Sequence, residues 1–361
     1  MGRVVVGMSG GVDSSVAAYL LKEQGYDVVG VTMQIWQKED ACSIEENGGC
    51  CGLSAVEDAR RVAAALKIPY YVMNFRQEFQ KSVIDYFTDE YLNGRTPNPC
   101  IACNRYVKWE ALLNRSLSIG ADYIATGHYA RIEQLPNGRY ALRRSAALAK
   151  DQTYALYNLT QEQLKRTLMP VGAYSKDEIR AIAERKGLLV ADKPDSQDIC
   201  FVPDGDYAHV MEAYTGKRYP TGVFQTKSGE VLGRHRGIIH YTVGQRRGIG
   251  ISAQRPLYVC QIQAESNTVI LGNREDLDSG SAMISNVHWI SGQIPQAPFR
   301  CRAKIRSRQQ EQPATVYPQG PHDARIVFDH PQRAVTPGQA AVLYEGDVVL
   351  GGGEIQRAGD T

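Results

Sequence analysis

An apolar strand that runs directly into a glycine- and serine-rich loop is the feature that most constrains this chain. The strand is Arg3–Gly7, the loop is Gly7–Ser15 (GMSGGVDSS), and a helix is predicted from Ser14 to Gln24. Glycines let the backbone turn tightly and bring N–H groups close to phosphate oxygens, and a helix N-terminus adds unpaired donors and partial positive charge. The segment therefore predicts a nucleotide phosphate site on an α/β fold.

The polar residues of the loop suit the same chemistry. Ser9, Ser14 and Ser15 can add hydroxyl donors, and Asp13 is placed to hold a divalent cation that bridges the phosphates. The loop has neither the Gly-Lys-Ser/Thr of a Walker motif nor the Gly-x-Gly-x-x-Gly of a dinucleotide site. The string SGGVDSS instead resembles the PP-loop of ATP pyrophosphatases, which split ATP between its α- and β-phosphates. An ordinary strand–turn–helix with two glycines is the alternative interpretation.

The chain has 361 residues, more than one hydrophobic core usually supports, and its character changes twice along its length. Strands and helices alternate up to about residue 205, which predicts a mostly parallel sheet covered on both faces. Short β-rich runs follow, and a third segment from about residue 280 is β-rich and broken by prolines. We expect an α/β nucleotide-binding domain over residues 1–207, a small mixed domain over 208–278, and a C-terminal β-barrel or sandwich over 279–361.

Charge and hydropathy narrow the class of protein. The net charge of +2 is too small to indicate a nucleic-acid binder by itself, so an RNA surface would need local clustering of basic residues. No run approaches the roughly 18 apolar residues that a membrane helix needs. The N-terminal segment reads as a strand and not as a signal peptide. We therefore expect a cytoplasmic protein with no membrane partner.

The eight cysteines favour metal or redox chemistry over a disulfide scaffold in a reducing cytosol. Cys42, Cys50 and Cys51 lie in a glycine- and acid-rich loop that could bind metal or oxidise together, although variable surface is the commoner explanation. Cys260 and Cys301 are flanked by strand-like sequence, and we interpret them as small buried apolar residues.

Two segments place cysteines where sulfur chemistry is expected. They are TPNPCIACN at 96–104 and DSQDICF at 195–201. The prolines predict a loop followed by a helix from about Tyr106, so Cys103 is expected near a helix N-terminus, with Arg105 and Lys108 close in sequence. Both influences lower a thiol pKa. Sulfur transfer needs thiolates, one to carry sulfur as a persulfide and a second to release it by forming a disulfide.

These motifs occur in the order found in the MnmA family, the tRNA-specific 2-thiouridylases. The chain also carries ATGHY at 125–129, KDQTY at 150–154, TVGQRRG at 242–248 and TPGQ at 336–339. The resemblance spans nearly the whole chain. It implies an adenine nucleotide alpha-hydrolase-like N-terminal domain and a C-terminal β-barrel that binds tRNA.

The resemblance also implies roles for individual residues. Cys200 matches the persulfide-bearing cysteine, Cys103 matches its nucleophilic partner, and Asp13 belongs to the catalytic set. The positions that match the ATP site are Gly7, Met8, Ser9, Gly10, Gly11, Val12, Asp13, Ser14, Met33 and Gly127. The segment that matches the surroundings of the flipped target base is Asn98, Pro99 and Cys100. The other positions that match tRNA contacts are His128, Lys150, Asp151, Gln152, Arg306, Ser307 and Gln339.

Cys100 departs from the family pattern, in which many members carry Asp. Together with Cys103 and Cys200 it would give three thiolate ligands, enough for a [4Fe–4S] cluster with one iron open to carry sulfide. Related PP-loop tRNA thiolases use such three-cysteine clusters. The competing interpretation keeps Cys100 as a bystander and lets Cys103 and Cys200 work by persulfide and disulfide. A structural zinc site would need a fourth ligand that the sequence does not identify.

A row of basic residues marks a candidate RNA surface. Its members alternate along one predicted strand and are Arg300, Arg302, Lys304, Arg306 and Arg308. Such a row suits a phosphate backbone, but a solvated edge strand that resists aggregation gives the same pattern. The resemblance favours the RNA surface, and Arg246 and Arg247 are further candidate phosphate contacts.

The implied reaction uses ATP and Mg²⁺, the anticodon stem-loop of a tRNA, and a sulfur relay protein or cysteine desulfurase as sulfur donor. The C2 carbonyl of the wobble uridine is adenylated, pyrophosphate leaves, and sulfur from Cys200 or a cluster displaces AMP to give 2-thiouridine. One alternative is a PP-loop amidating synthetase that acts on a small molecule and needs neither Cys103 nor Cys200. Another is a non-catalytic RNA-binding protein that holds ATP as a structural ligand.

Overall fold

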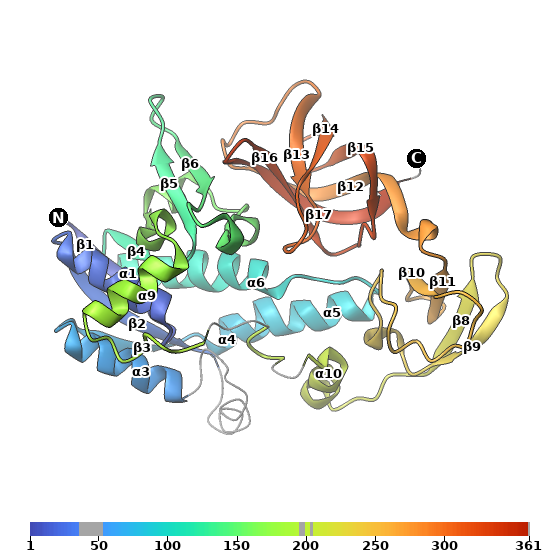
Figure 1. Cartoon of the computed structure of the whole chain (residues 1–361), viewed down its shortest axis with the longest axis horizontal. Helices are drawn as coiled ribbons and strands as arrows, with labels where there is room; N and C mark the ends of the chain where they lie inside the picture. The colour runs from blue at the N-terminus through green and yellow to red at the C-terminus, as the bar shows by residue number, and fades with distance from the viewer. Residues whose placement is uncertain (36–52, 195–198, 203–204, 360–361) are drawn as a thin grey trace.

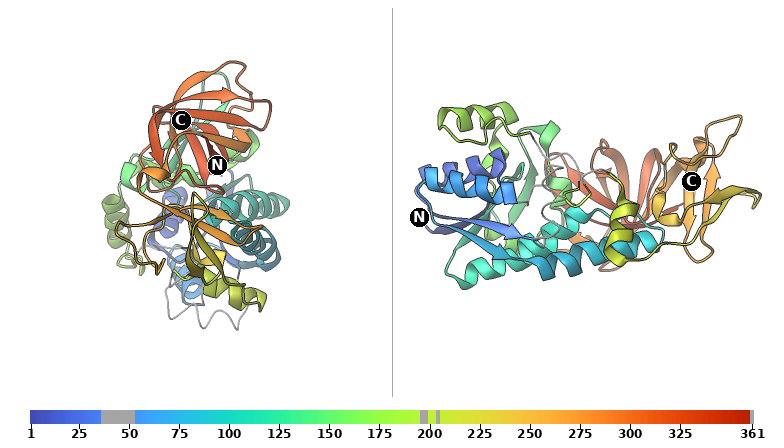
Figure 2. Two further views of the ribbon diagram at one scale, coloured as in Figure 1. Left: turned by 90° about the vertical axis from the view of Figure 1, so that its right-hand side faces the viewer. Right: turned by 90° about the horizontal axis from the view of Figure 1, so that it is seen from below.

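The computed structural model describes residues 1–35, 53–194, 199–202 and 205–359 of the chain. An α/β part at one end carries the N-terminus, a β-barrel lies beside it, and a small sheet formed by β8–β11 lies at the other end (Figure 1). Seen from below, the molecule is elongated along this direction (Figure 2). None of the helices in these ranges is long and apolar enough to cross a membrane.

The N-terminal part is built on a five-stranded sheet in the order β3-β2-β1-β4-β7. Every neighbouring pair is parallel. The strands are β1 (Arg3–Gly7), β2 (Asp27–Gln34), β3 (Tyr70–Asn74), β4 (Tyr123–Ala125) and β7 (Thr167–Leu168). The valines of β1 are fully buried, as expected for a central strand covered on both faces. The predicted parallel sheet is therefore confirmed.

Helices cover both faces of this sheet. One face carries α1 (Val12–Glu23), α3 (Leu53–Ala65) and α9 (Lys176–Arg185), whose apolar residues share a core with β1. A Ser175–Glu178 capping box starts α9, with both reciprocal hydrogen bonds present. The opposite face is covered by two helical rods that pack side by side (Figure 1). Their segments are α4 (Arg76–Phe79), η1 (Gln80–Asp85), α5 (Tyr86–Leu92), α6 (Pro99–Ala102), η2 (Cys103–Leu112) and α7 (Leu113–Ser118).

The strand order reverses between β1 and β4. From β1 the chain builds outward through β2 and β3, and it then returns to place β4 on the other side of β1. In open parallel sheets, ligands bind at the carboxyl ends of the strands on either side of such a reversal. The predicted nucleotide loop follows β1 at this edge.

A hairpin links the α/β part to the barrel. It is formed by β5 (Ala130–Gln134) and β6 (Tyr140–Arg144), and β6 pairs with strand β17 of the barrel. Asp347 of the barrel accepts hydrogen bonds from Arg131 at 2.9 Å and Arg143 at 2.6 Å. Short helices return the chain to the sheet; they are η3 (Leu148–Lys150), η4 (Thr153–Ala155), α8 (Gln161–Lys165) and η5 (Pro170–Ala173).

The middle part is mixed α and β, as predicted. Its four-stranded sheet has the order β10-β11-β8-β9. The elements are α10 (Tyr207–Thr215), β8 (Gly222–Thr226), β9 (Val231–His235), η6 (Ile238–His240), β10 (Tyr258–Gln263), β11 (Thr268–Gly272) and η7 (Glu275–Leu277).

The C-terminal part is a closed barrel, which settles the choice between barrel and sandwich. Its strands follow the order β12-β15-β14-β13-β16-β17, and an additional β12–β17 pairing closes the ring. They are β12 (Asp278–Trp289), β13 (Phe299–Lys304), β14 (Gln312–Pro318), β15 (Ala324–Arg333), β16 (Ala340–Glu345) and β17 (Val348–Gly359). A buried apolar cluster that includes Ile284, Ile326 and Leu343 fills the interior.

Candidate functional site

The loop between β1 and α1 has the geometry of a phosphate cradle. Gly11 is the N-cap of α1 and no side chain caps its amides. Gly10 adopts a φ of +70°, and a Cβ there would lie 2.3 Å from the backbone oxygen of Ala55, so this position requires glycine. Around Gly11 the nearest atom to an added Cβ is Ser9 Oγ at 3.5 Å. The backbone of Ala55 therefore packs against the loop at Gly10, whereas the loop is open at Gly11. The unpaired amides at the N-terminus of α1 face this open side.

Hydrogen bonds between serine side chains and the backbone stabilise the loop. The amide of Ser9 donates to Ser14 Oγ at 3.2 Å, and the hydroxyls of Ser14 and Ser15 donate to the backbone oxygen of Gly11 at 3.2 and 2.9 Å. The backbone oxygen of Met8 accepts from Thr32 at 2.7 Å on the neighbouring strand β2. Met33, on the same strand, is partly buried against the core.

Asp13, in the first turn of α1, is the only acid of the loop, and two distant residues hold it. Lys176 Nζ lies 2.8 and 2.9 Å from its carboxylate oxygens, and the hydroxyl of Tyr129 donates to it at 2.7 Å. A second lysine, Lys193, donates to the backbone oxygen of Gly10 at 3.2 Å and to Asp58 at 2.8 Å. A carboxylate and two ammonium groups thus converge on the loop, a set that fits a nucleotide phosphate and its divalent cation.

The end of β4 closes against the same loop. A Cβ at Gly127 would lie 2.6 Å from the backbone nitrogen of Ser14 and 2.7 Å from the carbonyl carbon of Asp13. Only a residue without a side chain allows this approach. Gly127 and the loop are therefore brought together by the structure across the β1–β4 reversal.

The helix of Cys103 begins earlier than the sequence suggested. The Asn98 side chain accepts from the amide of Cys100 at 3.1 Å as the N-cap, and Pro99 occupies the first helical position, where proline is tolerated. Cys103 follows in helical conformation, and its amide already donates to Pro99 and Cys100. The predicted helix start at about Tyr106 is therefore wrong, because a proline that can start a helix was interpreted as a helix breaker. Cys103 is the fifth residue of the observed helix, and its amide is already bonded within that helix.

Past Cys103 the helix is π-helical over η2, and three polar side chains meet beside it. Lys108 Nζ donates to Asn104 Oδ1 at 2.8 Å and lies 3.4 Å from His128 Nε2. His128 Nδ1 lies 2.6 Å from Thr126 Oγ1. Burial, and secondly the charge of Lys108, hold the pKa of His128 well below its ordinary value, so the imidazole is neutral.

Cys200 is anchored by its neighbour. Phe201 packs edge-on against Phe79 at 6.0 Å and Phe87 at 5.2 Å between ring centroids. Ile199 and Cys200 are partly buried against the same core, as is Cys103. Residues 195–198 of the DSQDICF segment lie outside the described residues, as do Cys42, Cys50 and Cys51.

The expected three-cysteine metal site is not formed. In the part of the chain that the structure describes, no three His, Cys, Asp or Glu side chains gather in a way that could hold a metal ion, although Cys100, Cys103 and Cys200 all belong to it. Cys100 is exposed on α6, whereas Cys103 and Cys200 are packed against the core. The [4Fe–4S] expectation is therefore not supported by the described residues, since one of the three thiols lies at the surface and the other two are packed against the core. Between described residues there is likewise no disulfide bond.

The two remaining described cysteines behave as buried apolar residues. Burial raises the pKa of the Cys260 thiol to about 11 and that of the Cys301 thiol to about 12. Thiols with such pKa values are almost entirely protonated near neutral pH and are poor nucleophiles. Their interpretation as structural residues agrees with this environment.

The barrel is hydrogen-bonded to the loop that leads to the Cys103 helix. Gln339 donates to the backbone oxygens of Thr96 at 2.8 Å and Pro97 at 3.4 Å, and the amide of Thr96 donates to the oxygen of Pro337 at 2.8 Å. A Cβ at Gly338 would lie 2.8 Å from the Thr96 nitrogen. The TPNP and TPGQ motifs, far apart in sequence, therefore form one junction.

Arg95 adds ion pairs to this junction. Its guanidinium bonds Glu90 at 2.7 Å and pairs with Glu354 on β17, and it donates to Gln356 at 2.8 Å.

Several residues that were expected to contact tRNA make hydrogen bonds within the protein. Arg306 Nη2 donates to Val243 at 2.9 Å and also contacts Thr336, and Asp151 accepts from Ser145 at 3.0 Å and Thr153 at 2.6 Å. The side chain of Gln152 accepts from the amide of Tyr129 at 2.9 Å. Lys150 and Ser307 are exposed.

Two members of the basic row are paired with acidic side chains. Arg300 bonds Asp329 at 2.5 and 2.6 Å, and Arg302 lies 3.4 Å from Glu311. Lys304 lies over the ring of Tyr154. Since β13 ends at Lys304, Arg306 and Arg308 do not continue its face. β13 pairs with both β14 and β16, so it is not the edge strand of the alternative interpretation, and its basic residues do not form a continuous row either.

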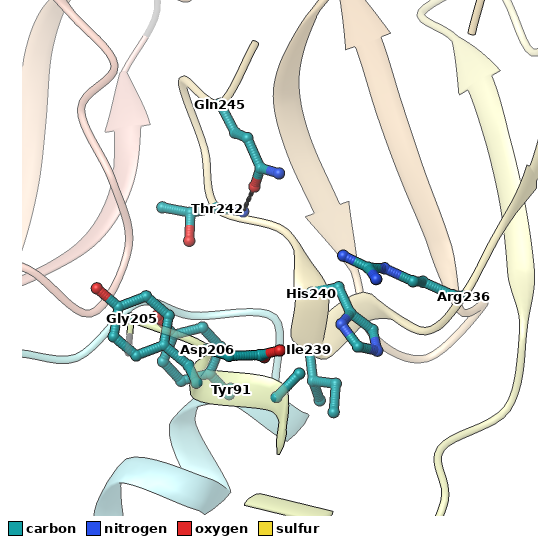
Figure 3. Close-up of a pocket in the computed structure, with 10 residues that line it drawn as sticks. Tyr91, Gly205, Asp206, Arg236, Ile239, His240, Thr242 and Gln245 are labelled. Carbon is teal, nitrogen blue, oxygen red and sulfur yellow. Dashed lines mark hydrogen bonds between the residues drawn. The ribbon is translucent and has the colours of Figure 1, made fainter. Parts of the chain in front are cut away.

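A pocket lies where the α/β and middle parts meet (Figure 3). Tyr91 of α5 stacks on Tyr207 of α10 at 6.0 Å, while Thr242 and Gln245 line the opposite side. The pocket includes neither the nucleotide loop nor a cysteine. It is therefore separate from the candidate site at the β1–β4 reversal.

Sequence reasoning missed Lys176, Lys193, Tyr129 and Arg95 as parts of the site, and treated Lys108 only as a neighbour of Cys103. Two of them had a usable signal. Tyr129 ends the ATGHY motif, and Lys193 lies in the segment leading to Cys200. Lys176 is the first residue of α9, and its sequence context indicates only the start of a helix, with no signal for a nucleotide site.

Comparisons with known proteins agree along the whole chain. Residues 2–204 match a family described as tRNA methyl transferase HUP domain, residues 208–273 a tRNA methyl transferase PRC-barrel domain, and residues 279–355 an aminomethyltransferase beta-barrel domain. A protein of Lachnoclostridium phytofermentans named tRNA-specific 2-thiouridylase MnmA is 61% identical over 98% of this chain and 99% of its own length. Proteins of the same name from Acetivibrio thermocellus and Clostridioides difficile are 57% and 54% identical, over 98% and 99% of this chain and 99% and 98% of their own lengths. The chain belongs to the MnmA family of tRNA-specific 2-thiouridylases.

Proposed function

We propose that this chain is a tRNA 2-thiouridylase that uses ATP to convert the wobble uridine (U34) into 2-thiouridine, with AMP and pyrophosphate as the other products. The names of its relatives supply the substrate class. The observation in this chain that carries the proposal is the meeting of an open phosphate loop and the helix of Cys103 at one edge of the sheet. A PP-loop synthetase for small molecules would have no use for that helix.

ATP binds with its phosphates on the loop from Gly7 to Ser14, and Gly127 and Met33 bound the rest of its site. The hard oxygen ligands that suit Mg²⁺ come from Asp13, with the hydroxyls of Ser9 and Ser14 nearby. When bound, Mg²⁺ supplies charge neutralisation for the phosphates. Lys176 and Lys193 are placed to exchange their present protein partners for phosphate oxygens.

Adenylation makes the replacement of oxygen by sulfur feasible. The uridine O2 forms a bond to the α-phosphorus, and the bond from that phosphorus to the β-phosphate bridging oxygen breaks as pyrophosphate leaves. A carbonyl oxygen is a poor leaving group, whereas AMP is a good one. Asn98, Pro99 and Cys100 lie at the start of the Cys103 helix, and we assign to them the surroundings of the flipped base.

Sulfur then passes from Cys200, after a sulfur relay protein or cysteine desulfurase has loaded it as a persulfide. The terminal sulfur attacks C2, and AMP leaves with the former O2. The Cys103 thiolate attacks Cys200 Sγ, which breaks the S–S bond, leaves sulfur doubly bonded to C2 and joins the two cysteines in a transient disulfide. A cellular dithiol reduces that disulfide before the next turnover.

The tRNA is held by exposed groups around this edge. Lys150 and Ser307 are exposed, His128 lies 3.4 Å from Lys108 of the Cys103 helix, and Gln339 contacts the loop before that helix. Contacts from Asp151, Gln152 and Arg306 would be made by atoms not already used within the fold, because their side chains brace neighbouring segments.

The test is to incubate the protein with α-labelled ATP, a persulfide donor and unmodified tRNA. The proposal predicts tRNA-dependent release of AMP and pyrophosphate, with 2-thiouridine at the wobble position. Turnover of ATP with a small amine and without tRNA would indicate an amidating synthetase. Binding of ATP and RNA without any pyrophosphate release would indicate a non-catalytic binding protein.

A further inference from the structure

Lys108 has an environment that its sequence position did not reveal. It is half-buried on η2, and its Nζ is held by Asn104 Oδ1 at 2.8 Å and His128 Nε2 at 3.4 Å. Within the described ranges of the chain, no carboxylate lies at ion-pair distance from it. This contrasts with Lys176 and Lys193, which both pair with acids of the nucleotide loop region.

The partners of Lys108 are neutral, so its charge is oriented but not cancelled. The side chain of Asn104 is itself fixed, since Nδ2 donates to the backbone oxygen of Ala155 at 2.9 Å and Oδ1 is thereby turned toward Lys108. His128 accepts from Lys108 through Nε2, which requires the proton to reside on Nδ1, where Thr126 Oγ1 is the partner at 2.6 Å. A half-buried cation between neutral groups is suited to receive an anion.

The position of Lys108 relates it to the reacting centre. His128 directly follows Gly127, which packs against the first turn of α1 at Asp13 and Ser14. Leu112, at the end of η2, lies beside Gly7, where an added Cβ would be 3.7 Å from its side chain. Cys103 and Lys108 are the first and sixth residues of η2, so they lie a little over one helical turn apart. Along η2, Lys108 thus lies between Leu112, which borders the nucleotide loop, and Cys103.

We infer that Lys108 is a catalytic residue that contacts a non-bridging oxygen of the α-phosphate of ATP and stabilises the charge that develops there during adenylation. The loop amides and Asp13 contact the departing pyrophosphate from the β1 side, while Lys108 contacts the α-phosphate from the β4 side, where His128 follows Gly127. It moves no proton; it acts through charge alone in a site with little water. This assignment rests on the proposed adenylation reaction.

Three substitutions separate charge from structure. Lys108→Gln keeps hydrogen-bonding groups for Asn104 and His128 but removes the charge, Lys108→Met removes both, and Lys108→Arg keeps the charge. Lys81→Met, on an exposed position of η1, is the matched control. The measurement is single-turnover, tRNA-dependent pyrophosphate release at saturating ATP and tRNA, together with both KM values and the thermal midpoint.

We expect Lys108→Gln and Lys108→Met to slow pyrophosphate release by about 10²–10³-fold, the usual loss for one transition-state donor, with KM values within about threefold of wild type. Lys108→Arg should recover part of the rate, and Lys81→Met should match wild type. If Lys108→Met lowers the thermal midpoint, its slower pyrophosphate release could come from a damaged fold. The rate of Lys108→Gln, which keeps the hydrogen-bonding groups, then tests the role of the charge.

The inference is overturned if Lys108→Gln releases pyrophosphate at the wild-type rate, or if its defect lies wholly in the KM for tRNA. A wild-type protein that releases no pyrophosphate with tRNA would instead contradict the proposed function itself, before any variant is compared.

Discussion

The side-chain amide of Gln339, in the loop before β16 of the barrel, donates to the backbone oxygen of Thr96 at 2.8 Å. This contact joins residues separated by 243 positions in sequence. It fixes the segment from which the Cys103 helix starts, and Gly338 allows the two backbones to approach. The barrel therefore has a direct mechanical connection to the proposed sulfur-transfer site, whatever part of the tRNA it also binds.

Replacing Gln339 with Glu should loosen this junction. The carboxylate cannot donate to the oxygens of Thr96 and Pro97 and repels them, so we expect a stability loss of about 1–3 kcal/mol. Displacement of the Cys103 helix should lower kcat/KM for tRNA thiolation by about ten- to a hundredfold. Gln319→Glu, on an exposed turn of the barrel, is the control. Equal activity in the two variants would show that the junction does not position the site.

The ion pair between Asp13 and Lys176 predicts a separable effect on activity and stability. Asp13 is 30% exposed and Lys176 13% exposed, so Asp13→Asn leaves a largely buried ammonium without its carboxylate. We expect thermal stability to fall and tRNA-dependent pyrophosphate release to drop by at least about a hundredfold. Adding Lys176→Met should restore stability but not activity. Wild-type pyrophosphate release by Asp13→Asn would remove Asp13 from the ATP site.

The cysteines should differ in a predictable way. Cys103→Ala is expected to stop release of 2-thiouridine while tRNA-dependent pyrophosphate release continues, because its thiolate acts only after adenylation. Cys301→Ala and Cys260→Ala should thiolate tRNA at the wild-type rate, since burial keeps both thiols protonated. Mass spectrometry of nucleosides from digested tRNA measures the product. Multiple-turnover thiolation by Cys103→Ala at the wild-type rate would exclude its assigned role.

His128 predicts a contribution to acid sensitivity. Its folded-state pKa is depressed, so the unfolded chain binds a proton that the folded chain does not as pH falls below about 6.5. The stability it supports is present above that pH and is lost below it, by up to about 1.4 kcal/mol per pH unit. Urea unfolding from about pH 7.5 to pH 5 should show a shallower dependence for His128→Gln than for wild type. Identical slopes would mean that His128 is not held neutral.

Local chemistry made some of this structure predictable. The strand into Gly7–Ser15, the Ser175 capping box and the parallel sheet follow from patterns within a few residues, and all three are present. The predicted start of the Cys103 helix was wrong because proline has two opposite effects. It breaks the interior of a helix but is favoured at the first helical position, which Pro99 occupies.

Contacts between distant segments could not be predicted in this way. Lys176 and Lys193 reach the nucleotide loop from 163 and 183 residues away, and no local pattern encodes that meeting. The basic row on β13 alternates as predicted, but its acidic partners come from other parts of the barrel. The cluster expected for Cys100 failed for a related reason, because proximity in sequence did not give Cys100 and Cys103 the same surroundings.

The most direct test of the account is Cys200→Ala, assayed in parallel for pyrophosphate and for 2-thiouridine with a persulfide donor and unmodified tRNA. Adenylation needs the nucleotide loop and not the sulfur, so the account predicts tRNA-dependent pyrophosphate release in at least one turnover, with no detectable 2-thiouridine. Loss of both products in a folded variant, or wild-type formation of 2-thiouridine, would contradict the assignment of Cys200 as the sulfur carrier.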